Sequence, residues 1–278
     1  MAFELSTLAA IEETAVERVR YYCRNKPVVL AFSYGKDSCV VKHIMDLSGV
    51  PYVARYRPTT IDPPDLLRWG RKAYPGVVWE RPKQSMWDVV VRKGTPPTRH
   101  NRYCCEEMKE GASCPGGVVV MGIRWAESQR RKATRRMAEP CAKRNELLLN
   151  PIIDWSNDQL WRYIHWRNIP VSPLYQEGFD RLGCVGCPNA NWKSRVKELE
   201  RWPHIRDGWK KAFGRMLKAH PTRKEGGVEW KTAEDVYRWW LYEESRPKAD
   251  GPLVRLWSKF DDDGCDYGAT AEVQDANS

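Results

Sequence analysis

The sequence predicts an α/β fold, a doubly wound parallel sheet with helices on both faces, followed by a helical C-terminal extension. Short apolar runs typical of buried strands alternate with amphipathic segments typical of helices, which favours a parallel sheet covered on both sides. The chain has 278 residues, which suits one large domain with appendages. No apolar run approaches the roughly 20 residues of a membrane span, and the first residues lack the order of a signal peptide. We therefore expect a cytoplasmic protein with no membrane partner.

The elements of the first half follow one another as strand and helix. Pro27–Phe32 is expected as the first buried strand and Asp37–Leu47 as the helix after it. The run PYVARYR is the next strand, and a helix opens after Pro63-Pro64, because the fixed φ of proline suits a first turn. Val118–Ile123 then repeats the pattern of a strand that ends in a polar turn.

The second half of the chain is expected to be mainly helical. Ser156 or Asn157 can cap a helix that ends before Pro170. The segment 192–220 is rich in Trp, Lys and Arg and is expected to be helical, whereas the acidic end of the chain is expected to be mobile. Aromatic and basic residues alternate in the segment 192–220 as they do in nucleic-acid-binding modules, although Trp at helical spacing more often belongs to a core.

The charge of the chain is basic but unevenly distributed. The formal net charge is +10, while the residues after Gly251 carry −4, which leaves +14 for the rest. A basic body favours an anionic partner, such as a nucleotide or a nucleic acid, and is equally typical of a solubilising surface.

The turn SYGKDS, Ser33 to Ser38, lies between the first strand and its helix. Gly35 permits close backbone approach, the amides at a helix N-terminus form an anion cradle, and the hydroxyls of Ser33 and Ser38 add donors. Lys36 adds a positive charge, but Asp37 separates it from the serine, so the turn is not the usual P-loop. An ordinary strand-to-helix turn is the alternative interpretation.

This turn resembles the PP-loop, S-x-G-K-D-S, of the ATP pyrophosphatase superfamily, also called adenine nucleotide alpha-hydrolase-like. Ser33, Gly35, Lys36, Asp37 and Ser38 all match that motif. The resemblance implies that the loop grips the β- and γ-phosphates of ATP, with Mg²⁺ as a further cofactor, while pyrophosphate leaves during adenylation of a substrate.

The chain contains nine cysteines, four of which form two pairs: Cys104 with Cys105, and Cys184 with Cys187 at C-x-x-C spacing. Two thiolates three residues apart can bind one metal centre from a single turn. A zinc site, a redox-active dithiol and buried structural cysteines are the alternatives. We assign Cys23 and Cys39 to the structural class.

The two pairs, separated by a gap of 79 positions, resemble the pattern by which assimilatory adenylylsulfate reductases hold a 4Fe-4S cluster. The resemblance implies Cys104, Cys105, Cys184 and Cys187 as ligands, with Cys141 as the substitute for one of the tandem cysteines.

A third stretch, GIRWAESQRR, is similar to the G-x-R-x-x-E-S-x-x-R run of the same superfamily. The resemblance to phosphoadenylylsulfate (PAPS) reductase-like proteins then extends from about Pro27 to Asn189. Arginine can bind phosphate or sulfate oxygens in a bidentate way, and the resemblance implies catalytic roles for Lys36, Asp37 and Arg124. The matching nucleotide-binding positions in this run are Gly122, Arg124, Glu127, Ser128 and Arg131.

Two features distinguish this sequence from the reductases. Reductases have usually lost the Lys-Asp of the loop, whereas Lys36 and Asp37 are present here, which favours ATP. Reductases also carry a catalytic cysteine in E-C-G-L-H, and the surroundings of Cys265 do not match that motif. Three nearby aspartates would raise the pKa of the Cys265 thiol rather than activate it.

An intact loop with a cysteine cluster resembles the iron-sulfur ATP pyrophosphatases that act in thiolation, including the DNA phosphorothioation protein and some tRNA thiolases. This resemblance implies adenylation of an acceptor followed by sulfur transfer. The partners would be an adenine nucleotide, a sulfur donor such as a cysteine desulfurase, and a nucleic acid as one candidate acceptor, with a homodimer as one candidate assembly.

Two alternatives stay open: a sulfonucleotide reductase that forms sulfite with thioredoxin, and a non-catalytic nucleic-acid-binding module. On the first hypothesis, residues 1–190 form the PP-loop nucleotide-binding domain with its iron-sulfur loop, 191–250 the helical extension and 251–278 the acidic tail.

Overall fold

The computed structural model describes residues 2–109, 113–221 and 230–243, and the side chains of these ranges from residue 6 to residue 242. A six-stranded sheet in the order β3-β2-β1-β4-β6-β5 forms its centre. All neighbouring strands are parallel except β5 and β6. The strands are β1 Val28–Ala31, β2 Val53–Tyr56, β3 Val78–Trp79, β4 Val118–Val120, β5 Ala138–Cys141 and β6 Glu146–Leu149.

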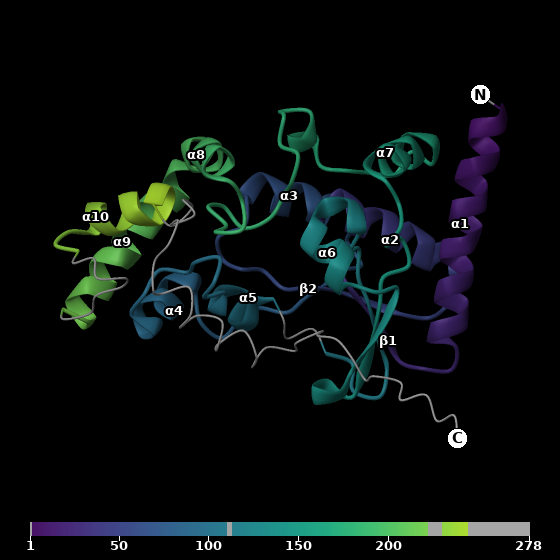
Figure 1. Cartoon of the computed structure of the whole chain (residues 1–278), viewed down its shortest axis with the longest axis horizontal. Coiled ribbons are helices and arrows are strands. Elements are labelled where there is room, and N and C mark those ends of the chain that lie inside the picture. The colour runs from purple at the N-terminus through teal and green to yellow at the C-terminus, as the bar shows by residue number, and fades with distance from the viewer. Residues whose placement is uncertain (1, 110–112, 222–229, 244–278) are drawn as a thin grey trace, which may run out of the picture.

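Helices connect the strands and continue beyond the sheet. Figure 1 shows α1 at one end of the molecule and α8, α9 and α10 at the other, near α4. Within the described ranges, every helix is too short or too polar to cross a membrane. The α-helices are α1 Ala2–Cys23, α2 Lys36–Ser48, α3 Pro64–Ala73, α4 Met86–Lys93, α5 Tyr103–Met108, α6 Gln129–Thr134, α7 Asn157–Trp166, α8 Trp192–Arg201, α9 Pro203–Ala219 and α10 Ala233–Arg238. The shorter helical turns are η1 Trp125–Glu127, η2 Ala142–Arg144, η3 Pro173–Tyr175 and the π-helical η4 Trp239–Glu243.

The order in which strands are added to the sheet reverses at β1. Val29 pairs with Val53 of β2 on one side and with Val119 of β4 on the other. The chain therefore winds from β1 to β2 and β3, and then returns to the opposite side of β1. At such a switch point the loops after the two strands separate and leave room for a ligand at their carboxyl ends. The loop 33–38 and the segment 121–124 after β4 meet at this point.

Both faces of the central strands are buried, which explains their nearly continuous valine runs. Leu30, Val120 and Leu149 belong to the main core, in which Val40 and Ile44 of α2 also lie. Their neighbours on the strands form a second, smaller cluster on the other face, with Val29, Val119 and Leu148 as members.

The predicted α/β class and the helical C-terminal region are confirmed, with element ends shifted by a few residues. Ser156 is the cap of α7, because its hydroxyl accepts the N–H of Gln159 at 3.1 Å. The segment 192–220 is helical as expected, but it breaks at Trp202, where α8 ends and Pro203 begins α9. The acidic tail 251–278 lies outside the described residues.

One strand differs from the prediction. We expected a parallel sheet, whereas β5 runs antiparallel to β6 at the edge. Asn145 has φ +49°, so it allows the tight turn that joins the two strands. Pro140 in β5 is exposed, and an edge strand tolerates proline because one side needs no ladder hydrogen bonds.

Three tryptophans of the extension form a core rather than a base-stacking surface, whereas Trp192 at the start of α8 is 45% exposed. Trp202, Trp209 and Trp240 are 3%, 1% and 0% exposed. The ring of Trp209 lies 4.6 Å from that of Trp240 and 5.2 Å from that of Trp87 in α4. The more conservative interpretation of these residues, as core, is therefore confirmed.

Candidate functional site

The loop between β1 and α2 holds its shape through its own side chains. The Ser38 hydroxyl donates to the carbonyl of Gly35 at 2.8 Å and accepts from the N–H of Ser33 at 3.3 Å. Tyr34 adopts φ +60° and is fully buried, so the chain turns sharply before the helix begins. No side chain caps α2 at Gly35. The first amides of α2 therefore point toward the open end of the loop, as in an anion cradle.

Gly122 lets the segment after β4 approach α2. A Cβ atom at this position would lie 2.9 Å from the carbonyl carbon of Asp37 and 3.0 Å from the amide nitrogen of Ser38. Any side chain would therefore collide with the backbone of the first turn of α2. The predicted site residue Gly122 has a steric role next to the loop.

Arg124 orients Asp37 from inside the protein. Its Nε lies 2.6 Å from Oδ1 of Asp37, and its side chain is only 1% exposed. The other two guanidinium nitrogens donate to the carbonyl of Trp155 at 3.0 Å and to Oδ1 of Asn157 at 2.9 Å. All three nitrogens of Arg124 thus have protein partners, and its contact with a nucleotide stays a prediction.

The other matching residues after β4 support local structure. Glu127 accepts the N–H of Arg124 at 3.0 Å and forms an ion pair with Arg131. The hydroxyl of Ser128 accepts the N–H of Arg131 at 3.2 Å and so caps α6. These contacts fix the turn that carries Arg124. Nucleotide contacts from Glu127, Ser128 and Arg131 stay predictions.

Lys36 lies at the mouth of the loop and contacts a distant part of the chain. Its Nζ is 3.3 Å from Oδ2 of Asp37 and 3.3 Å from the carbonyl oxygen of Asp180. Its backbone N–H donates to the hydroxyl of Tyr175 at 2.8 Å. Sequence reasoning did not single out Tyr175, because a contact across 139 positions leaves no local pattern.

The two cysteine pairs come from two segments of the chain, and the charges of one pair act on the other. Cys104 and Cys105 begin α5, while Cys184 and Cys187 lie before α8, where the N–H of Cys187 donates to the carbonyl of Cys184 at 3.2 Å. The hydrogen bond that Cys104 shares with Cys105 raises the pKa of Cys104, and the charges of Cys184 and Cys187 raise it further. All four predicted thiols therefore lie within reach of one another's charge.

Positive groups surround these thiols. Hydrogen bonding from Cys104, together with the charge of Arg102, lowers the pKa of Cys105 despite its burial. The charge of Cys184 is the largest cause of a raised pKa at Lys109. Arg102 also donates to the sulfur of Cys105 at 3.7 Å. Of Cys104, Cys105 and Cys184, only Cys105 is favoured in this way as the thiolate, the form in which cysteine binds metal, because the pKa of Cys104 is raised and burial raises that of Cys184 to about 11.

The four thiols were predicted to hold a 4Fe-4S cluster. In the part of the chain that the structure describes, no three His, Cys, Asp or Glu side chains are arranged to hold one metal ion. In a 4Fe-4S cluster each thiolate binds a different iron, so four sulfurs surround the cluster without converging on one point. Cluster binding by Cys104, Cys105, Cys184 and Cys187 stays a prediction.

Cys141 does not join these four thiols. It lies on β5 and packs with Cys114 and Leu148 in the smaller apolar cluster of the sheet. Cys23 and Cys39 are each 1% exposed, as expected for structural cysteines. Cys265 lies outside the described residues.

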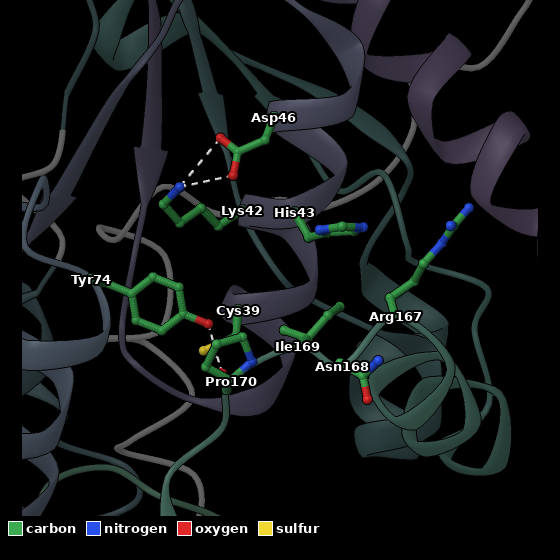
Figure 2. Close-up of a pocket in the computed structure, with 9 residues that line it drawn as sticks. All are labelled: Cys39, Lys42, His43, Asp46, Tyr74, Arg167, Asn168, Ile169 and Pro170. Carbon is green, nitrogen blue, oxygen red and sulfur yellow. Dashed lines mark hydrogen bonds and ion pairs between the residues drawn. The ribbon is translucent and has the colours of Figure 1, made fainter.

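A cavity of about 240 Å³ lies beside α2, away from the loop (Figure 2). Lys42 and Arg167 reach it, but Lys42 pairs with Asp46 at 2.9 Å and Arg167 pairs with Glu12. Because both cations already have carboxylate partners, we assign no anion site to this cavity.

Comparison with known proteins gives this site a family context. The model of the phosphoadenosine phosphosulfate reductase domain matches residues 27–190. An uncharacterised protein of Methanocaldococcus jannaschii is 26% identical over 231 residues, which are 77% of this chain and 46% of that protein. Adenosine 5'-phosphosulfate reductase of Agrobacterium fabrum is 36% identical over 131 residues, which are 44% of this chain and 50% of that protein.

The chain spans about half the length of the curated relatives that it matches. Among solved structures, phosphoadenylyl-sulfate reductase from Candida auris in a phosphate complex aligns with a TM-score of 0.46 at 17% identity, and it covers 64% of this chain and 93% of that chain. The family model spans more than half of the sequence, including the loop 33–38 and all four paired cysteines, so the chain belongs to the phosphoadenosine phosphosulfate reductase domain family.

Proposed function

We propose that this chain is an enzyme that binds ATP in the loop 33–38, adenylates an acceptor and supports sulfur transfer to it. The observation that carries the proposal is the intact Lys36-Asp37 pair, in which Arg124 orients Asp37 and Asp37 in turn lies 3.3 Å from the ammonium of Lys36. The sulfonate of a sulfonucleotide carries a single negative charge, whereas a departing pyrophosphate carries several and gains more from positive groups at the loop.

The reaction would proceed in two displacements. An acceptor oxygen attacks the α-phosphorus of ATP, and the bond to the bridging oxygen breaks, so that pyrophosphate leaves with the electron pair. Lys36, the hydroxyls of Ser33 and Ser38 and the first amides of α2 stabilise that charge. Sulfur from a donor such as a cysteine desulfurase arrives as a persulfide, and a second thiol reduces it to hydrosulfide with formation of a disulfide. The hydrosulfide then attacks the acceptor atom that carries the adenylated oxygen; the bond to that oxygen breaks as the bond to sulfur forms, and AMP leaves with the electron pair.

Mg²⁺ has no carboxylate reserved for it in this loop. One oxygen of Asp37 contacts Arg124 and the other lies near Lys36. Mg²⁺ usually reaches such sites already bound to the phosphates of its nucleotide. We therefore expect the triphosphate, rather than Asp37, to hold the metal, and we assign it no step.

Cys104, Cys105, Cys184 and Cys187 would hold a 4Fe-4S cluster. When bound, such a group would supply sulfur binding or electron transfer next to the nucleotide. The chain itself contributes Arg102 and Lys109, which offset the negative charge of the thiolates. We propose a nucleic acid as the acceptor, because the body of the chain is strongly basic.

A sulfonucleotide reductase is the second candidate, favoured by the names of relatives such as the reductase of Agrobacterium fabrum. In that case a cysteine thiolate would attack the sulfur of the sulfonucleotide. AMP would leave from adenylylsulfate, or adenosine 3',5'-bisphosphate from phosphoadenylylsulfate, and thioredoxin would release sulfite. Cys265 would be the attacking residue on the sequence analogy.

Calorimetric titration of anaerobically purified protein separates the two candidates. We expect ATP with Mg²⁺ to bind at least tenfold more tightly than either adenylylsulfate or phosphoadenylylsulfate, a difference of about 1.4 kcal/mol. Lys36→Ala should abolish this preference. Lys42→Ala is the matched control, because Lys42 lies on the same helix but pairs with Asp46. Tighter binding of a sulfonucleotide would refute adenylation and support the reductase.

The cluster has its own test. Anaerobic protein should contain about four irons per chain and show a brown visible absorption, and Cys184→Ala should remove both. Cys141→Ala should keep both, because Cys141 packs elsewhere. An unchanged spectrum in Cys184→Ala would refute this ligand set, and loss in Cys141→Ala alone would show that Cys141 is a ligand.

A further inference from the structure

The segment from Tyr175 to Asp180, which we call the arm, lies across the mouth of the loop. It follows η3 and leads to the cysteine segment before α8. The hydroxyl of Tyr175 accepts the N–H of Lys36 at 2.8 Å, and the carbonyl of Asp180 accepts from the ammonium of Lys36 at 3.3 Å. The arm therefore engages both of the groups through which Lys36 can bind an anion.

The contact places an oxygen where a phosphate oxygen would lie. An amide at the start of a helix, next to a glycine and a lysine, is the group that an anion would use. The Tyr175 hydroxyl also comes within 3.7 Å of the position that a Cβ atom of Gly35 would occupy. It thus sits directly over the loop.

The ring of Tyr175 is held in place independently of this hydrogen bond. It packs edge-on against Trp161 of α7, with ring centres 5.3 Å apart. The ammonium of Lys36 lies 5.5 Å from the centre of the same ring. Lys197 of α8 anchors the rest of the arm by donating to the carbonyls of Glu177 at 3.2 Å and of Gly178 at 2.6 Å.

We propose that the arm is a displaceable plug, in which the Tyr175 hydroxyl and the Asp180 carbonyl stand in for oxygens of the nucleotide's terminal phosphates. Both are neutral acceptors, and a hydrogen bond to a phosphate oxygen is about twice as strong as one to a neutral oxygen. A polyphosphate therefore displaces the arm, whereas AMP, which has no β- or γ-phosphate, leaves it in place. The Tyr175 hydroxyl therefore competes with polyphosphates for the loop and lowers their apparent affinity, without affecting that of AMP. This inference rests on the proposed function, because it assigns the loop to the terminal phosphates.

Tyr175→Phe tests the plug, because it removes the hydroxyl and keeps the ring. Full-length protein is titrated calorimetrically with inorganic pyrophosphate and, separately, with AMP. We expect Tyr175→Phe to bind pyrophosphate about fivefold more tightly than wild type, which corresponds to about 1 kcal/mol, with the affinity for AMP unchanged. Tyr74→Phe is the matched control, since its hydroxyl donates to Pro170 in the preceding segment at 2.6 Å. It should leave both affinities unchanged.

Unchanged or weaker pyrophosphate binding in Tyr175→Phe would overturn the proposal, as would a lack of binding by both proteins. Hydrogen exchange in wild-type protein gives a second measurement that needs no variant. Pyrophosphate should raise amide exchange across residues 172–180 as the arm leaves, and protection of that segment would also overturn the plug.

The outcomes for the plug and for the proposed function are distinct. Cleavage of ATP to AMP and pyrophosphate, with pyrophosphate affinity unaffected by Tyr175→Phe, would refute the plug and keep adenylation. Tighter pyrophosphate binding by Tyr175→Phe in a chain that prefers sulfonucleotides would keep the plug and refute adenylation.

Discussion

Gly122→Ala tests the close packing between β4 and the first turn of α2. The added methyl carbon would lie 2.9 Å from the carbonyl carbon of Asp37, so it needs a shift of about 0.5 Å to reach an ordinary carbon contact. Forcing a methyl group into such a contact costs about 1–3 kcal/mol. The same shift would displace the first turn of α2, whose amides form the anion cradle, so ATP binding should weaken as well.

Gly76→Ala provides the comparison. A Cβ atom at Gly76 meets nothing within 4 Å, so alanine there should be neutral or stabilise the protein by up to about 1 kcal/mol through the unfolded chain. Denaturant unfolding should thus separate the two variants by about 1–4 kcal/mol, and calorimetry should show weaker ATP binding only for Gly122→Ala. Equal stability and equal ATP affinity of the two variants would refute the steric role of Gly122.

Two further predictions concern buried charge. Arg124→Lys keeps the positive charge, but lysine cannot reach all three partners of the arginine. In denaturant unfolding we expect the free energy of unfolding to fall by about 2–3 kcal/mol, against less than about 0.5 kcal/mol for Arg130→Lys at an exposed position. Equal losses in the two variants would contradict the positioning role of Arg124. Burial raises the pKa of Glu198 to about 7 from its ordinary 4.5, although its carboxylate accepts the N–H of Gly186 at 2.8 Å. The folded state therefore favours the protonated acid. The contribution of Glu198 to the free energy of unfolding is fully present below pH 4.5 and is lost as the pH rises through about 7. We expect Glu198→Gln to be as stable as wild type at pH 4.5 and about 1–2 kcal/mol more stable at pH 8, after allowance for the partial exposure of the side chain. A gain of equal size at both pH values would show that burial of the Glu198 carboxylate is not the reason.

The parts of the site that could be predicted depend on short stretches of sequence. The loop 33–38 is recognisable because an apolar strand, a polar turn with Gly35 and a helix follow one another without interruption. The same order of strand and turn identified Arg124. In each case neighbouring residues determine the local structure, so the sequence carries the signal by itself.

The pairings between these stretches could not be predicted. Arg124 and Asp37 were both expected to bind nucleotide, but their contact with each other joins positions 87 residues apart. The antiparallel β5 was missed because its residues, Ala138–Cys141, include a glutamate and a proline and show no strand pattern. Such features depend on tertiary packing, which a single sequence does not display.

The helical extension has a part in the site that its sequence did not suggest. Three of its tryptophans fill a core, but Lys197 of α8 holds the arm at Glu177 and Gly178, and the arm in turn reaches Lys36. Nine residues after Tyr175, the same segment supplies Cys184. The loop 33–38 and the cysteine segment before α8 are therefore linked by one stretch of chain that α8 anchors. If a polyphosphate displaces Tyr175 as we propose, this stretch has to accommodate the movement, so we expect nucleotide binding to shift the segment that carries Cys184.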